Sequence, residues 1–322
     1  MTRIALRVGK RLAWAIVMLI AIVSVAFLIA HTLPGDPAQL LLGPQANART
    51  VAKARKLYQL DQPLSAQYVA YWRRLAKGDL GYSYRYRMPV TKLIAKKAPA
   101  SIQLALAALW IQLWFGICLG IVAAMRQGSF ADRGLIGLVL LGVSTPTFIT
   151  GLALQYVLAY RFGWVPYDGY GQSTTDTLLH LILPALTLGL YGAALYARLS
   201  RDEMRRALDT DYALAARARG ASMWRVATHH ALRNAAVPIA TLMVLEFGAL
   251  VGGAIVTEKL FRWPGMGAMA VDAMVNRDGP VILGTILFSA AAILIATLLL
   301  DAVAALIDPR LRTGSSRRDA VG

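Results

Sequence analysis

The sequence predicts an all-α membrane protein with six transmembrane helices. Of its 322 residues, 57% are hydrophobic and only 16% are charged, and the mean hydropathy is +0.52. Long apolar runs with few or no charges recur along the chain, and a helix needs roughly 20 such residues to cross a bilayer core about 30 Å thick. Together these observations exclude a soluble enzyme with an apolar core.

The first span is expected over residues 12–30, after a basic cytoplasmic segment, residues 1–11. A cleaved signal peptide is the alternative, although its apolar region would be shorter, about 7 to 15 residues. The other five spans form a predicted transmembrane core over residues 98–307. Two of them carry no charge, 98–125 and 134–160, and three contain an ionisable residue, 177–197, 234–257 and 279–307.

The ionisable residues in the last three spans are His180, Glu246 and Asp301. Burying such a group in lipid is costly, so each is a functional candidate. Glu246 lies well inside its span, where it could face a transport pathway or pair with a neighbouring helix. The other two lie nearer span ends, where capping or snorkelling explains them.

Two pairs of glycines have the G-x-x-x-G spacing: Gly116 with Gly120, and Gly248 with Gly252. Small residues at this spacing let two membrane helices approach closely. We expect both pairs to serve helix packing.

The distribution of lysine and arginine between the loops predicts that both termini lie in the cytoplasm. With the amino terminus inside, the inner side holds 18 of these residues and the outer side 16. However, 12 of the outer ones fall in the loop 31–97, and loops longer than about 60 residues cross the membrane largely regardless of charge. Without that loop the count is 18 against 4, which puts loop 198–233 and the tail 308–322 inside.

The outer loop, residues 31–97, is predicted to form a helical cap. LPGDP at 33–37 stops the first span, and helix formers follow at 51–60. An aromatic stripe then recurs at helical spacing, and GDLGYS at 78–83 ends that helix. The stripe, Gln67, Tyr68, Tyr71, Trp72 and Leu75, is expected to pack against the spans, although an outer cap could also receive a partner protein.

Other classes of function find no support in the sequence. The basic residues behind the net charge of +17 are spread over short loops, which favours contact with membrane lipid over a nucleic-acid partner. The single Cys118 excludes an internal disulfide and a cysteine-based metal cluster. No phosphate-binding loop is present, so nothing in the sequence shows how this chain could bind ATP as a cofactor by itself. His229 and His230 point about 100° apart on a helix and cannot easily share a metal ion.

The loop 198–233 is expected to hold two short helices. In the first, one stripe contains Tyr212, Ala215, Ala216 and Arg219, whose small members would let a partner surface approach. Gly220 suits a helix C-terminus, and Ser222 suits the cap of a second helix over Met223–Arg233 that leads into the fifth span. A basic cytoplasmic loop can also serve membrane topology alone.

Seven segments carry a resemblance to a known family. They are ARARG at 216–220 with HALRNAAVP at 230–238, LPGDP at 33–37, LDQPLSAQY at 60–68, GDLGYS at 78–83, HLILPALTLGL at 180–190, GGAIVTEKLFRWPGMG at 252–267 and DPRLR at 308–312. In this order and spacing the sequence resembles the inner-membrane permease subunits of bacterial ABC importers, in the dipeptide and oligopeptide (peptide/nickel) branch. Many importers have an acidic residue where Leu214 stands here, and the peptide branch commonly lacks it too.

The resemblance implies a permease subunit rather than an enzyme. It would pair with a second, similar permease to enclose an alternating-access pathway for dipeptides or oligopeptides, which an extracytoplasmic substrate-binding protein would deliver. Two separate ATPase subunits would bind ATP and Mg²⁺ and dock on a cytoplasmic coupling helix. The residues expected to make that contact are Tyr212, Ala215, Ala216, Arg217, Arg219, Gly220, Met223 and Trp224.

The stretch TEKLFRWPGMG, residues 257–267, is a candidate outer gate. In this hypothesis it folds back at the end of the fifth span and places Glu258 and Arg262 near the substrate-binding protein. An ordinary span end with Trp263 as an interfacial anchor is the alternative. For the whole chain, the rival functions are a stand-alone secondary transporter with Glu246 in an ion-coupling site and an intramembrane enzyme.

Overall fold

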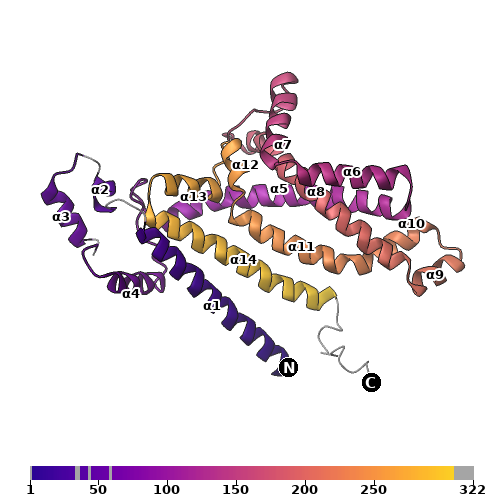
Figure 1. Ribbon diagram of the computed structural model, residues 1–322, viewed down its shortest axis with the longest axis horizontal. Coiled ribbons are helices and arrows are strands. Elements are labelled where there is room, and N and C mark those ends of the chain that lie inside the picture. Colours follow the sequence, from indigo (N-terminus) through magenta and orange to yellow (C-terminus); the bar gives the residue numbers. More distant parts are fainter. Residues whose placement is uncertain (1, 33–36, 43–44, 58–59, 308–322) are drawn as a thin grey trace. The chain divides into compact units, whose positions relative to one another are not determined.

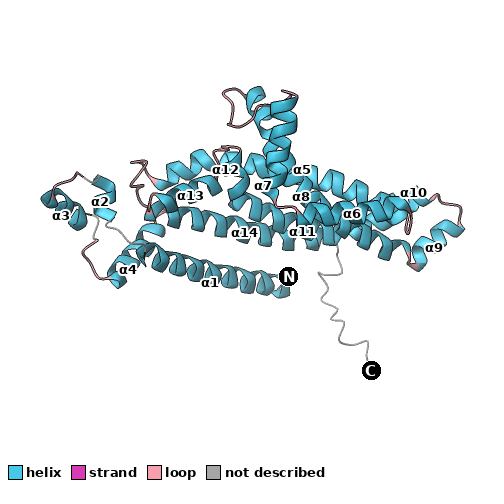
Figure 2. Ribbon diagram, turned by 45° about the horizontal axis from the view of Figure 1, so that its top comes forward, coloured by secondary structure: helices cyan, strands magenta, loops and turns pink. Residues whose placement is uncertain are grey.

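The computed structural model describes residues 2–32, 37–42, 45–57 and 60–307. Within these ranges the regular elements are helices (Figure 2), apart from one isolated antiparallel bridge between Tyr82 and Pro89. The predicted all-helical fold class is therefore confirmed. The expected tail 308–322 lies outside the described residues, and so does most of the motif at 33–37.

The chain divides into two compact units, and the first comprises Met1–Ser101, Val251–Glu258 and Pro264–Ala292. Its helices (Figure 1) are α1 (Thr2–Thr32), α2 (Pro37–Leu42), α3 (Ala48–Leu57), α4 (Leu64–Leu75), the start of α5 (Val90–Met125), most of α12 (Ile255–Leu260), α13 (Met266–Val275) and the first half of α14 (Gly279–Ile307).

Within the first unit, the aromatic face of α4 packs against α1. Tyr71 is buried with Val23 and Phe27 of α1 and with Leu283 of α14, and the hydroxyl groups of Tyr68 and Ser24 lie 2.6 Å apart. The predicted packing role of the stripe is therefore confirmed, because burying aromatic surface is strongly favourable.

The second unit comprises Ile102–Leu250, Lys259–Trp263 and Ile293–Gly322. Besides the remainder of α5, α12 and α14, it contains α6 (Phe130–Ser144), α7 (Thr147–Leu154), the π-helix η1 (Gln155–Arg161), α8 (Thr174–Leu208), α9 (Asp211–Ala218), α10 (Met223–Arg225), the π-helix η2 (Val226–Ala231) and α11 (Leu232–Gly252).

Among the residues that the structure describes, four helices are long and apolar enough to cross a membrane, over Val90–Met125, Thr174–Leu208, Ala235–Gly252 and Gly279–Leu299. A shorter apolar run, Ala13–Ile29, falls in the first expected span.

Two of the expected spans, 134–160 and 234–257, differ from their predicted bounds. The run 134–160 is broken, because Thr145 and Pro146 are extended between α6 and α7. Proline lacks an N–H and disfavours helical geometry in the residue before it. The run 234–257 ends early at Gly252, because Gly253 has φ +126° and a Cβ there would lie 2.5 Å from the Gly267 nitrogen.

Glycines bring α5 and α8 together in the second unit. A Cβ on Gly120 would lie 2.5 Å from the Ser200 Cβ, and one on Gly116 would overlap Tyr196. The predicted packing role of this pair is therefore confirmed. Close backbone approach of this kind is typical of small residues at helix interfaces in membranes.

Candidate functional site

The loop after α8 folds back on the end of the second unit, where α9 and α10 lie in Figure 1. α8 continues eleven residues past its expected end at 197 and stops at Leu208. The hydroxyl of Thr210 donates to the Ala207 carbonyl (2.6 Å), which fixes the turn into α9. The first part of the expected loop 198–233 is therefore helix, and α9 begins from a rigid support.

α9 has a buried face made of small residues. Ala213 and Ala216 are buried with Val226, Ala227 and Ala231 of η2 in one hydrophobic cluster. Alanine on the inner face allows the short helix to lie close to η2, since a larger side chain would not fit without displacement. Because one face of α9 is buried in this cluster, only its other face is available to a partner protein.

The turn after α9 has the predicted local structure. Gly220 adopts φ +86°, and its N–H donates to the Arg217 carbonyl at 2.9 Å. The hydroxyl of Ser222 then accepts from the Arg225 N–H at 3.4 Å. A left-handed residue after a helix followed by a serine N-cap is a common way to join two helices.

The second helix does not end at Arg233 as predicted. α10, η2 and α11 follow one another without a break from Met223 to Gly252, with Pro238 inside the helix. The turn before Met223 is therefore joined to a candidate membrane span by an unbroken helical segment.

The exposed face of this segment differs from the predicted stripe. Ala216 is only 4% exposed, so it supports α9 from beneath and cannot contact a partner, which corrects its predicted role. Leu214 and Trp224 are instead exposed by 51% and 58%, and Tyr212 by 41%. Leu214 lies outside the predicted stripe, which contains the neighbouring Ala215 and Ala216.

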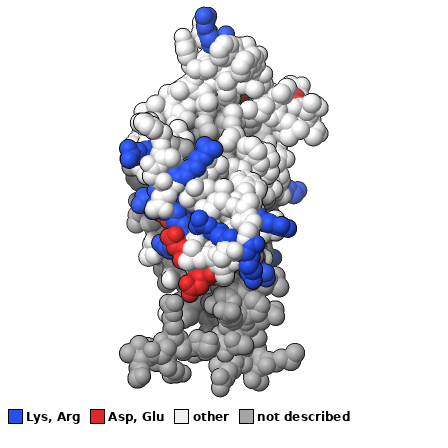
Figure 3. Space-filling view, turned by 90° about the vertical axis from the view of Figure 1, so that its right-hand side faces the viewer, with Lys and Arg blue, Asp and Glu red and all other residues white. Residues whose placement is uncertain are grey.

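The remaining predicted docking residues surround this apolar surface. Ala215, Arg217, Arg219 and Gly220 are exposed, and Met223 is half-buried. Basic side chains gather on the face of the molecule that carries α9 and α10, with few acidic ones among them (Figure 3). The surface therefore offers large apolar groups with exposed arginines beside them, and Asp209 and Asp211 are also exposed next to Tyr212; this mixture of apolar and charged groups suits a protein partner.

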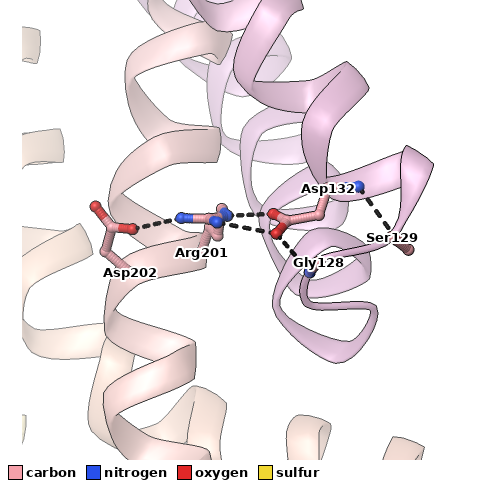
Figure 4. A network of polar contacts seen from close by, with 5 residues as sticks. All are labelled: Gly128, Ser129, Asp132, Arg201 and Asp202. Carbon is pink, nitrogen blue, oxygen red and sulfur yellow. Dashed lines mark hydrogen bonds and ion pairs between the residues drawn. The ribbon is translucent and has the colours of Figure 1, made fainter.

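A clasp that sequence reasoning missed holds the turn between α5 and α6 against α8 (Figure 4). The Arg201 guanidinium donates to both carboxylate oxygens of Asp132, Nε to Oδ1 at 2.5 Å and Nη2 to Oδ2 at 3.0 Å. The Gly128 N–H donates to the same carboxylate at 3.0 Å, and Arg201 also reaches Asp202 at 3.0 Å. Bidentate pairs of this type are strong and geometrically specific.

The clasp lowers the pKa of Asp132 to about 2. The side-chain hydrogen bonds from Arg201 are the largest cause, and the Gly128 N–H acts in the same direction. Burial opposes them, because it disfavours the charged carboxylate. The two residues are 69 positions apart in the sequence, so no local pattern could have indicated the pair.

Glu246 lies on α11, half-buried, next to Gln112 of α5. The Gln112 amide donates to the Leu188 carbonyl at 3.2 Å and approaches the Glu246 carboxylate at 3.4 Å. The sequence left two roles open for Glu246, facing a pathway or pairing with a neighbouring helix. The contact with Gln112 is a pairing of the second kind. The contact is long for a hydrogen bond and leaves the carboxylate partly accessible.

Glu258 is completely buried in the first unit, which corrects its predicted role as a residue at the surface of a gate. Its carboxylate accepts from the Ser101 hydroxyl at 2.8 Å and from the Ala268 N–H at 2.7 Å. Ser101 in turn accepts from the Met266 N–H at 2.8 Å. Glu258 therefore caps the N-terminus of α13, where a negative charge is favourable.

Arg262 belongs to the second unit and keeps an exposed side chain. It lies 3.1 Å from the Asp168 carboxylate, and the Phe261 carbonyl accepts from the Gly169 N–H at 2.9 Å. Its exposure fits the predicted position of a gate residue, whereas nothing in its contacts identifies a partner.

Among the residues that the structure describes, no group of three His, Cys, Asp or Glu side chains could hold a metal ion. His229 is exposed, and the side chain of His230 lies outside what the structure describes.

Comparison with known proteins places this geometry in context. The family described as "Binding-protein-dependent transport system inner membrane component" matches residues 116–313, and its N-terminal companion matches residues 1–105. The chain is 38% identical to the glutathione transport system permease protein GsiC of Salmonella choleraesuis (strain SC-B67) and 39% identical to that of Escherichia coli (strain K12). Each match covers 94% of this chain and 97% of the relative.

A solved structure shares the fold. The chain resembles the inward-facing MetNI methionine ABC transporter with a TM-score of 0.57 and 14% identity, over 68% of this chain and 97% of the other.

Proposed function

Because this chain belongs to the family of binding-protein-dependent transport system inner membrane components, and is therefore a permease subunit of an ABC importer, we propose that it imports short peptides, including glutathione. Support for this substrate class comes from the relatives that are named glutathione transport permeases and match nearly the whole chain. The chain itself is not an enzyme, since permeases of this family leave ATP hydrolysis to separate subunits.

An importer of this family works with an ATPase and a substrate-binding protein. The proposed assembly contains a second, similar permease, two ATPase subunits that bind ATP and Mg²⁺, and one binding protein on the outer side. Both termini and α9 lie in the cytoplasm in this arrangement, and α2 to α4 lie outside.

The proposed docking surface for an ATPase subunit consists of Tyr212, Leu214 and Trp224 with the arginines beside them. The single observation that carries this assignment is the division of α9 into two faces. Ala213 and Ala216 are buried against η2, whereas Leu214 is exposed by 51%. A short helix that buries alanines and exposes leucine is favoured when a partner covers the leucine.

Coupling follows from the continuity of the helix that starts at Met223. ATP binding closes the ATPase pair and moves the docking surface, and the unbroken path into α11 carries this movement into the membrane. Each nucleotide state must favour one permease conformation through different contacts, and the docking surface provides them.

The test is co-purification of the ATPase subunits with the permease from membranes. We expect Leu214→Asp combined with Trp224→Ala to remove the ATPases while the permease remains folded. Leu64→Asp in α4 is the matched control, because Leu64 is exposed by 48% and Leu214 by 51%. If the ATPases remain bound to the double variant, or if uptake in vesicles follows an ion gradient and not ATP, the proposal is wrong.

A further inference from the structure

Phe130, the first residue of α6, is the most exposed large hydrophobic residue described in the second unit, with 92% of its surface accessible. It follows the short turn that joins α5 to α6. A single exposed apolar side chain is common. This one is unusual because the backbone around it is tightly held.

Three interactions fix the position of Phe130. The Ser129 hydroxyl caps α6 by accepting from the Asp132 N–H. Asp132 is bound by Arg201 and by the Gly128 N–H, and Gly128 adopts φ +74°. All these contacts involve residues within two positions of Phe130, except Arg201 of α8 (Figure 4). The phenyl group is therefore presented to solvent from a rigid backbone, which reduces the entropy lost on binding.

The turn lies at the same end of the second unit as the docking surface. Ile121 and Ala124, in the last turns of α5, share a hydrophobic cluster with Ala213 and Ala216 of α9. Arg201, which holds the turn, is seven residues before the end of α8. Phe130 and Leu214 are thus supported by one core and face the same compartment.

The charges around Phe130 suit a partner that carries acidic groups. Arg126 and Arg133 are exposed on either side, as the arginines are around Leu214 and Trp224. Aromatic anchors at a membrane interface are mainly Trp and Tyr, which have a polar group for the interface, and Phe has none. An apolar anchor with a basic border is complementary to a pocket with an acidic rim.

We propose that Phe130 is a second contact point for the cytoplasmic ATPase subunit, inserted into an apolar pocket with an acidic rim. The contact rests on the proposed function and extends the docking surface from α9 to the turn between α5 and α6. The Asp132–Arg201 clasp then has a positioning role, because it ties this second contact to α8 and hence to α9.

The test is photo-crosslinking in cells that express the complete transporter. A benzophenone amino acid replaces Phe130 in one sample and Trp224 in a second. A third carries it at Trp110, a 65% exposed residue in the candidate membrane span of α5. We expect adducts with the ATPase from the first two positions and adducts with lipid alone from the third.

The outcomes separate the two proposals. ATPase adducts from Trp224 together with lipid adducts, or none, from Phe130 overturn the second contact and leave the proposed function intact. Absence of ATPase adducts from both positions overturns the proposed function as well.

The affinity of the ATPase subunit for the purified permease provides a quantitative test. Phe130→Ala is expected to weaken ATPase association with the purified permease about tenfold, as truncation of one interface aromatic often does, and Phe130→Trp to restore most of it. Affinity unchanged by Phe130→Ala contradicts the proposal. Folding is not at risk in these variants, because the side chain is almost fully exposed.

Discussion

At the scale of single residues, two buried carboxylates hold together segments that are distant in the sequence. Asp132 accepts from Arg201, and Glu258 accepts from Ser101 and from the N-terminus of α13. Each charge is compensated by at least two donors, which is the condition under which a buried carboxylate does not destabilise a fold. Both residues therefore stabilise the fold, and we expect their replacement to affect transport only through this loss of stability.

Replacement of Glu258 by Gln should lower stability by about 1–3 kcal/mol. The amide nitrogen of Gln cannot accept a hydrogen bond, so the Ser101 hydroxyl or the Ala268 N–H loses its partner inside the protein. The apparent melting temperature of the purified permease in detergent measures this change. Arg262→Ala is the control, since its exposed ion pair with Asp168 is expected to contribute less than about 1 kcal/mol. Equal stability of the two variants would contradict the capping role.

The Asp132–Arg201 clasp should make stability depend on pH in the acid range. The pKa of Asp132 is about 2 in the folded protein, below the value of about 4 for an unperturbed aspartate. A lowered pKa contributes stability that is complete above about pH 4 and is lost as the pH falls toward about 2. The difference in melting temperature between the wild type and Asp132→Asn should therefore be constant from neutral pH to about pH 5 and shrink below it. A difference that grows on acidification would refute this assignment.

At the scale of elements, glycine determines how closely α5 and α8 pack. The backbone of α8 lies so near Gly120 that a Cβ there would be 2.8 Å from the Ala197 carbonyl oxygen. Both helices continue from the candidate membrane region toward α9 and contribute to the hydrophobic cluster beneath it. The distance between them therefore also affects the position of the docking surface.

Gly120→Ala should force α5 and α8 apart and lower stability by about 1–3 kcal/mol, the usual effect of overpacking. Gly137→Ala in α6 is the matched control, because no atom lies within 4 Å of a Cβ at that position. The control should be neutral or slightly stabilising, since alanine is the better helix former. Thermal unfolding of both variants in the same detergent measures the contrast, and similar melting temperatures would argue against close packing.

At the scale of the whole molecule, the distribution of charge is expected to fix orientation in the membrane. The chain has a net charge of +17, and outside the loop 31–97 most of its basic residues fall on the side assigned to the cytoplasm. We expect this bias to select the orientation in which α9 faces the cytoplasm, as the proposed contact with the ATPases requires.

Single cysteines can test that orientation, because the chain has only Cys118. In a Cys118→Ser background, a maleimide that cannot cross membranes should label Arg49→Cys in intact spheroplasts. It should label Leu214→Cys only after permeabilisation, and the background protein should give no signal. Both positions are exposed, so burial does not limit the reaction. The opposite labelling pattern would reverse the proposed topology.

The features that could be predicted from the sequence are those that depend on neighbouring residues. Apolar length located the membrane helices, the glycine at 220 and the serine at 222 located the turn after α9, and the ordered motifs identified the family. These signals are local, since helix length, capping and left-handed backbone depend on residues only a few positions apart.

Which side of each helix is buried, and which charged groups pair, depends on the packing of distant segments and could not be predicted from the sequence. Ala216 points inward and Leu214 outward because η2 returns against α9 from beyond the turn. Glu258 is a cap and not an exposed gate residue because α5 and α13 enclose it. Arg201 pairs with Asp132, which is 69 positions away in the sequence, because α6 packs along α8. Such contacts depend on how distant segments pack, which no local pattern in one sequence encodes.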